Sequence, residues 1–88
     1  MKKIYFKYNN NEFQKLQDIL LSLGCEWAFS KKEKLISGDM FDCITLYSDL
    51  ILVLKNSKQI NSGVIYDINK ENIKDIEVYV NSMKMGLL

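Results

Sequence analysis

The 88-residue chain contains no histidine, no arginine and no proline. Without arginine it has no guanidinium group, the side chain that grips phosphates and guanine edges through two parallel hydrogen bonds. Without histidine it lacks both the side chain whose ordinary pKa lies nearest neutrality and the commonest metal ligand. These absences exclude imidazole-based catalysis and imidazole metal ligation, and they weigh against specific recognition of phosphates.

Motifs for catalysis or for a cofactor are also missing. The sequence has no glycine-rich phosphate loop, no HExxH and no GxSxG, the patterns that mark nucleotide binding, zinc proteases and serine hydrolases. Asp39, Asp42 and Asp49 lie near one another in the sequence, but their spacing matches no calcium-binding loop. We interpret them as solvated turn residues. We therefore expect no catalytic residue, no metal and no cofactor, and a protein that is not an enzyme.

The formal net charge is +1, which produces no strong field toward nucleic acid or a membrane surface. Three lysines lie between residues 31 and 34 with a glutamate among them, a composition typical of a solvated turn. The opening residues, MKKIYFKYNN, lack the apolar core of a signal peptide. We expect a cytoplasmic protein in which Cys25 and Cys43 pack as small apolar side chains. A disulfide between them is the alternative, and it would require secretion.

Two apolar runs, Cys43–Tyr47 and Leu50–Leu54, are separated only by Ser48 and Asp49. Neither run approaches the roughly 18–20 apolar residues that span a bilayer, so we expect no membrane segment. Each run has the length of a strand, and together they predict a strand pair. The connection lacks the glycine that a tight two-residue hairpin prefers, which favours a wider or bulged turn.

The second of these runs is apolar on both faces. Leu50, Leu52 and Leu54 alternate with Ile51 and Val53, so neither side of the strand is suited to water. One strong helix in the sequence can cover one face of the sheet. We therefore expect either the C-terminal segment or another molecule to cover the other face.

The rest of the sequence predicts a single domain over residues 1–88 of the α+β class. Residues 3–8 alternate as a half-buried strand does. Apolar residues then recur at helical spacing over residues 11–23, and Gly24 follows as a helix stop. Either Asn9 with Glu12 or Asn11 with Gln14 has the spacing of a capping box. We predict an antiparallel sheet of four or five strands with this one main helix packed on one face.

Further strands are expected at residues 25–29 and 64–68, with a return of the chain at residues 35–36. Residues 76–80, IEVYV, fit both helical spacing and strand alternation; a short helical turn over residues 69–75 followed by a strand is favoured over one long helix. The predicted core comprises Ile4, Phe6, Phe13, Leu16, Leu20, Leu23, Ile44, Leu46, Leu52 and Leu54.

The order of elements resembles a group of small accessory proteins of bacteriophages that infect low-GC bacteria. Their shared pattern is a lysine-rich first strand, a helix ending in Leu-Gly-aromatic-x-Trp, and a strand of the type Ile-x-Leu-Tyr. Leu23, Gly24 and Trp27 match the first motif, while Ile44, Leu46 and Tyr47 match the second. A cysteine stands where an aromatic residue is more usual, and the resemblance covers about the first 55 residues. It implies a phage or prophage origin and no defined enzymatic activity.

We accordingly expect a non-catalytic protein that binds and inhibits or sequesters a host protein, for example one of host defence, in the host cytoplasm, and that forms homo-oligomers. The expected partner-binding residues are Trp27, Tyr47, Ile51, Val53 and Tyr66. One alternative is a binding protein for a small ligand, such as a nucleotide signal, held at a dimer seam. Another is a nucleic-acid-binding regulator or an immunity protein, although the composition argues against contact with nucleic acid.

Overall fold

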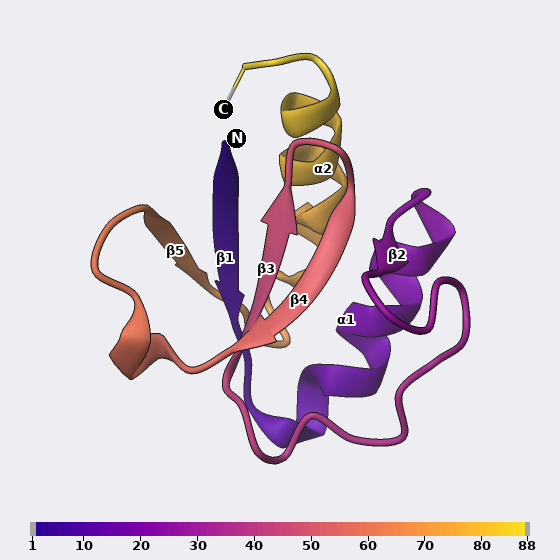
Figure 1. The fold of residues 1–88 in the computed structure, drawn as a ribbon, viewed down its shortest axis with the longest axis vertical. Helices are drawn as coiled ribbons and strands as arrows, with labels where there is room; N and C mark the ends of the chain where they lie inside the picture. The colour runs from indigo at the N-terminus through magenta and orange to yellow at the C-terminus, as the bar shows by residue number, and fades with distance from the viewer. Residues whose placement is uncertain (1, 88) are drawn as a thin grey trace.

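The computed structural model describes residues 2–87. Five strands form one sheet in the order β2-β4-β3-β1-β5, and two helices pack against it (Figure 1). In chain order the elements are β1 (Lys3–Lys7), α1 (Asn10–Ser22), β2 (Glu26–Trp27), β3 (Cys43–Tyr47), β4 (Ile51–Lys55), the 3-10 turn η1 (Ser57–Gln59), β5 (Val64–Asp67), the 3-10 turn η2 (Ile73–Asp75) and α2 (Ile76–Lys84).

The sheet is mixed, although its centre is antiparallel as expected. β3 pairs antiparallel with both β1 and β4, whereas the edge strands β5 and β2 run parallel to β1 and β4. A tight connection suffices for the antiparallel β3–β4 pair, while parallel neighbours need longer crossover connections. The α+β class is confirmed.

Helix α1 agrees with its prediction to within a residue. Its first turn is capped by Asn9, whose Oδ1 accepts a hydrogen bond from the Glu12 backbone N–H at 3.2 Å. Of the two capping arrangements that the sequence allows, the earlier one is used. Just past the C-terminal end of the helix, Gly24 has a φ of 99°. Glycine adopts such a positive φ with less steric strain than any other residue, because it has no Cβ.

The C-terminal segment corrects the prediction, because residues 76–80 form a helix and not a strand. Ile73, Ile76, Val80 and Met83 are all buried, and their spacing places them on one side of η2 and α2. Burial of this stripe outweighs the β-propensity of the IEVYV segment. Tyr79 on the same helix stacks on another tyrosine, with 4.2 Å between ring centroids.

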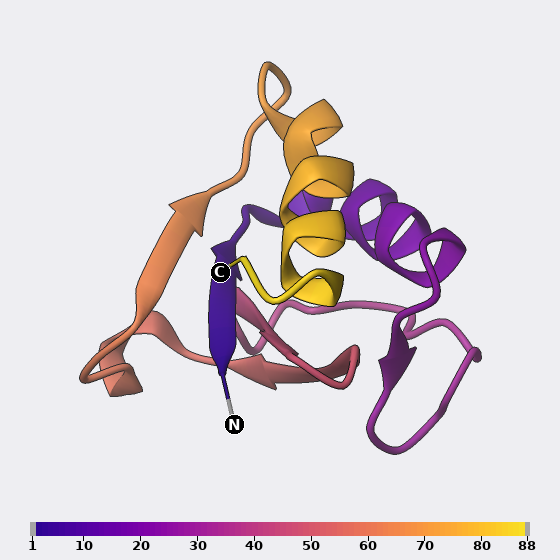
Figure 2. The same cartoon turned by 90° about the horizontal axis from the view of Figure 1, so that it is seen from above.

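Both helices cover the same face of the sheet (Figure 2). The core lies between them and the strands, and side chains that share one face, such as Phe6 and Ile44, are paired across β1 and β3. The predicted core residues are buried with two exceptions, Leu23 and Leu54, which are half-buried.

The opposite face of the sheet is partly covered by the connection from β4 to β5. Tyr5 points to this face yet is only 2% exposed. Gly63, in the connection, packs against Tyr5 so closely that a Cβ added to the glycine would lie 2.9 Å from the Tyr5 ring. Cys43 and Thr45 are also buried there. Of the two covers expected for this face, the C-terminal segment does not lie on it, because both helices pack on the other side; the loop does part of this work.

Three short segments, the β3–β4 turn, the end of β2 and residues 35–36, differ from their predictions or refine them. The β3–β4 turn spans residues 48–50, wider than two residues, and Leu50 adopts a φ of 69°. Strand β2 is only two residues long, so Phe29 lies outside it and is 98% exposed. Residues 35–36 form no strand. Within residues 2–87, no helix has both the length and the apolar character needed to cross a membrane.

Candidate binding site

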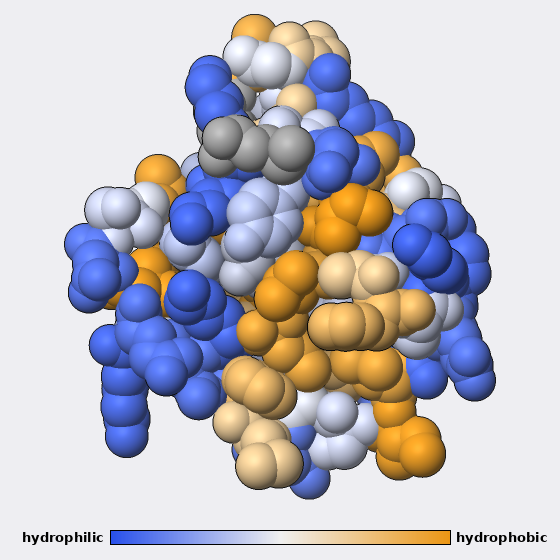
Figure 3. Space-filling view, in the orientation of Figure 1, coloured by the Kyte–Doolittle hydropathy of each residue, from blue (hydrophilic) through white to orange (hydrophobic). Residues whose placement is uncertain are grey.

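An apolar hollow with a volume of about 240 Å³ lies beside the second half of β4. We call it the β4 hollow; its walls are Trp27, Ala28, Phe29, Ser30, Leu35, Phe41, Leu52, Val53 and Leu54. None of these residues is charged. In the space-filling view, apolar side chains gather over β4 and the neighbouring loop (Figure 3). Depletion of charge is typical of the buried centre of a protein interface.

The hollow exists because β2 ends early. The backbone of Trp27 exchanges two hydrogen bonds with that of Lys31, at 2.9 and 3.1 Å, so the chain turns back on itself. Lys31 has a φ of 59° within this turn. Directly after β2, the Ala28 N–H donates a hydrogen bond to the Leu52 carbonyl of β4 at 3.1 Å. The space that a longer β2 would fill is thus left open.

The inner wall of the hollow is held by Gln17, a buried amide on α1. Its Oε1 accepts hydrogen bonds from the Trp27 indole N–H and the Leu35 backbone N–H, both at 2.7 Å. Its Nε2 donates to the Leu35 carbonyl at 3.1 Å and to Gln14 at 2.9 Å. Because two wall residues are fixed by one side chain, the hollow is preformed.

Large apolar side chains on the same loop reach into water. Phe29 is 98% exposed, Ile36 96% and Met40 85%, while Phe41 is 36% exposed. A concentration of exposed apolar side chains marks an interaction surface more often than chance exposure does. Neither Phe29 nor Phe41 was among the predicted partner-binding residues. The adjacent Met40 and Phe41, two large apolar residues directly after a polar turn, were the available signal.

The five expected partner-binding residues do not share one surface. Trp27 is buried and Val53 half-buried, and both line the hollow. Tyr66 faces the helices, with its ring centroid 6.2 Å from that of Phe6. Tyr47 and Ile51 are half-buried on the opposite face of the sheet. Val53 also points to that face, because it pairs with Thr45.

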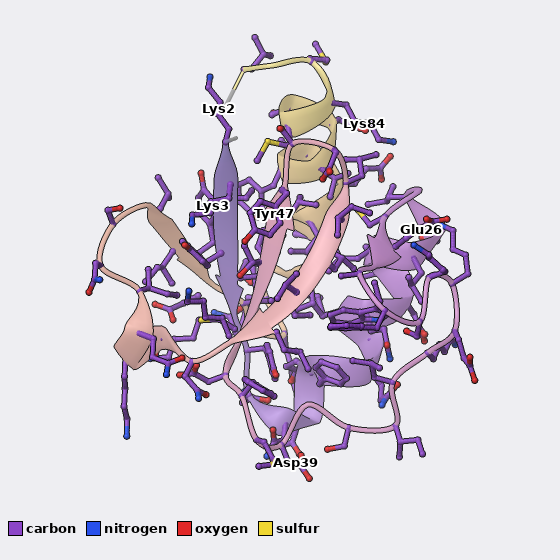
Figure 4. The ribbon with its side chains drawn as sticks, viewed as in Figure 1. Lys2, Lys3, Glu26, Asp39, Tyr47 and Lys84 are labelled. Atoms are coloured by element: carbon purple, nitrogen blue, oxygen red, sulfur yellow. The ribbon has the colours of Figure 1, made fainter. Side chains whose placement is uncertain are left out.

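On that opposite face, the Lys3 Nζ lies 5.9 Å from the centroid of the Tyr47 ring, and Figure 4 shows the two side chains on neighbouring strands. The same ammonium group lies 5.9 Å from the Tyr5 ring. This contact between a lysine and two tyrosines is separate from the β4 hollow.

Both thiols and the Tyr8 hydroxyl are held in their protonated forms. Burial raises the pKa of Cys25 to about 11, although Lys84 and Lys32 act in the opposite direction. Burial and the charge of Asp42 raise the pKa of Cys43 to about 11. Burial likewise raises the pKa of Tyr8 above its ordinary value, and its hydroxyl donates to the Gly38 carbonyl at 2.8 Å.

The three aspartates do not converge on a cation site. Asp42 accepts hydrogen bonds from the Ser57 N–H at 2.6 Å and from the Ser57 hydroxyl, whereas Asp49 accepts from the Ile51 N–H at 3.2 Å. No group of three or more acidic or cysteine side chains placed to hold a metal ion occurs in the described part of the chain.

The lysines of the 31–34 turn are largely engaged within the molecule. Lys32 donates to the carbonyls of Leu21 and Cys25, both at 2.9 Å, which completes the end of α1. Lys34 forms an ion pair with Asp18 at 2.6 Å. The turn therefore supports the fold and offers no cluster of free ammonium groups.

Compared with known protein families, with curated proteins and with solved structures, the chain matches none.

Proposed function

We propose that this chain is a non-catalytic binding protein that docks a partner protein at the β4 hollow. The observation that carries the proposal is a preformed, uncharged hollow with exposed phenylalanines beside it. Binding energy at protein interfaces concentrates in a few large anchors that fill such pockets. The lining of the hollow contains no charged side chain and no thiol.

The size of the hollow favours a protein anchor over a nucleotide. Its volume of about 240 Å³ lies below the roughly 300–1,000 Å³ of pockets that enclose small-molecule ligands. A nucleotide also requires donors for its phosphates, and the ammonium groups of Lys32 and Lys34 already have partners. A single aromatic or large aliphatic side chain of another protein needs no such donors.

In keeping with the phage-like pattern of the first 55 residues, we propose a host protein as the partner and inhibition or sequestration in the host cytoplasm as the consequence. Two positions of that pattern have structural roles near the site, and one of them lines it. Gly24 ends α1 with a φ of 99°, and Trp27 forms a wall of the hollow. One residue that resembles the phage group, Trp27, therefore helps to shape the surface proposed to bind.

The test compares the wild-type chain with Ala28→Trp, which fills the hollow from its exposed wall, and with Glu71→Trp, which adds the same side chain on the turn before α2. Each variant is immobilised and exposed to lysate of a low-GC bacterium. We expect a protein that is retained by the wild type and by Glu71→Trp, and that Ala28→Trp fails to retain. A protein held equally by all three would place the binding surface elsewhere.

Sedimentation of the three purified variants completes the experiment. If the wild type and Glu71→Trp form dimers and Ala28→Trp is a monomer, the partner at the hollow is a second copy of the chain, not a host protein. If all three are monomers and none retains a protein, the proposed function is wrong.

A further inference from the structure

Resting on the proposed function, we infer that the occupant of the β4 hollow is an extended segment of the partner protein. This segment adds as a strand beside Leu54 and places one aromatic or branched aliphatic side chain in the hollow. The inference names a binding mode, main-chain pairing combined with one anchored side chain, which a pocket alone does not require.

The backbone of β4 shows why a strand fits there. The Glu26 N–H donates to the Leu50 carbonyl at 3.0 Å, and the Ala28 N–H donates to the Leu52 carbonyl at 3.1 Å. Backbone groups of alternate strand residues point to the same side, so the N–H and carbonyl of Leu54 point to this edge as well. They lie past the end of β2, beside the hollow that Leu54 itself lines.

The other edge of β4 is already used. β3 pairs with β4 from Leu52 to Lys55, with Val53 opposite Thr45. Leu54 is therefore the position at which β4 offers a donor and an acceptor to an added chain. Strand addition draws its affinity from such main-chain bonds and its specificity from a pocket for an alternate side chain.

A segment of another protein fits this edge better than a second copy of this chain does. The strand that a copy would offer is β5, the edge strand opposite β2. Ile68 donates its N–H to the Lys7 carbonyl at 2.8 Å, so by alternation Ile65 and Asp67 carry the outward-pointing groups. The Asp67 carbonyl already accepts a hydrogen bond from Asn72 Nδ2 at 2.6 Å. One of the four outward-pointing backbone groups of Ile65 and Asp67 is thus already occupied.

The probe is a blocked five-residue peptide, threonine-valine-phenylalanine-valine-threonine, titrated into the isotope-labelled protein and followed by nuclear magnetic resonance. We expect shifts of the Leu54 amide and the Trp27 indole signals. Replacing the phenylalanine of the peptide by alanine should abolish them. N-methylation of the peptide, one residue at a time, should weaken binding about tenfold at alternate positions only, because alternate N–H groups face β4.

On the protein side, Leu54→Pro removes the donor N–H while Leu54→Val retains it. The Leu54 N–H does not serve the β3 ladder, and proline is tolerated where an edge N–H faces outward. Each variant is first checked for cooperative thermal unfolding. We expect Leu54→Pro to weaken peptide binding about tenfold more than Leu54→Val.

The outcomes separate this inference from the function on which it rests. If the phenylalanine peptide binds and every N-methylated form binds equally well, the hollow takes a side chain without strand pairing; the inference is overturned and the proposed function stands. If no peptide shifts the signals of the hollow at millimolar concentration, the inference is likewise overturned. The comparison of Ala28→Trp with Glu71→Trp then decides the proposed function by itself.

Discussion

Gln17 is the residue on which the geometry of the hollow depends most. A buried amide on an amphipathic helix would be costly if its polar atoms had no partners. Here the amide binds the Trp27 indole and both backbone groups of Leu35. One side chain therefore joins α1, β2 and the loop that follows β2, segments that the sheet itself does not hold together.

Gln17→Leu should lower the free energy of unfolding by about 2–4 kcal/mol, because several buried polar groups lose their partner at once. The comparison is Gln14→Leu, which removes two hydrogen bonds to the carbonyls of Leu35 and Ile36 at an exposed site and the one that Gln14 accepts from Gln17, but leaves the Gln17 bonds to Trp27 and Leu35 in place. It should cost about 1 kcal/mol or less. Urea unfolding followed by circular dichroism measures both. An equal decrease in the free energy of unfolding for both variants would show that Gln17 does not hold these segments together more than Gln14 does.

At the scale of elements, the connection between β4 and β5 is fastened by one carboxylate. Burial alone would raise the pKa of Asp42, but the hydrogen bonds from the Ser57 hydroxyl and backbone, together with the charge of Lys7, lower it. Because Ser57 begins η1, this interaction ties the start of the connection to the residue before β3.

The lowered pKa of Asp42 makes this fastening sensitive to acid. The folded carboxyl stays ionised at a lower pH than the unfolded one, so its stabilisation is present above about pH 4 and is lost as the pH falls through the folded pKa. Asp42→Asn should therefore lower stability at pH 7, by about 1 kcal/mol. The difference from the wild type should shrink below pH 4. Urea unfolding over this range tests it, with Asp39→Asn as an exposed control; a difference that is independent of pH would contradict the assignment.

The elements that the sequence predicts well are those whose signals are local. Helix α1 has its cap at Asn9, an apolar stripe and Gly24, all within one short stretch. Helix α2 was ambiguous because its apolar residues suit both periodicities, and the choice depends on burial against α1 and the sheet. The early end of β2 could not be predicted, because nothing in a lysine at position 31 indicates a left-handed turn.

The candidate site was predicted only in part for the same reason. Trp27 and Val53 were expected to contact a partner, and both line the hollow. Phe29 and Phe41 were missed because their place in the site depends on the turn at residues 28–31 and on the loop that Gln17 holds. A site that lies where a strand stops is set by tertiary contacts, and alternation within the sequence does not reveal it.

At the scale of the whole molecule, the sheet separates two regions of unequal thickness. The core under the helices contains Cys25, whereas Cys43 lies on the other face, beneath the β4–β5 connection. A region covered by one short loop should open more readily than a core covered by two helices. The two thiols are therefore natural reporters of the two sides.

A thiol reagent at pH 8 should modify Cys43 before Cys25. Both thiols have a pKa of about 11, so only about one in a thousand would be ionised and labelling must await local opening. Mass spectrometry with proteolytic mapping gives the two rates, and urea-unfolded protein provides the fully reactive control. Equal rates for both thiols in the folded protein would mean that the two sides open together.

The placement of Trp27 also has a practical consequence. It is the sole indole in the chain, it lines the hollow, and its N–H is held by an amide from α1. The indole fluorescence of the unmodified protein thus originates at the place that a bound side chain would occupy, and no dye or tag is needed to follow occupancy of the hollow.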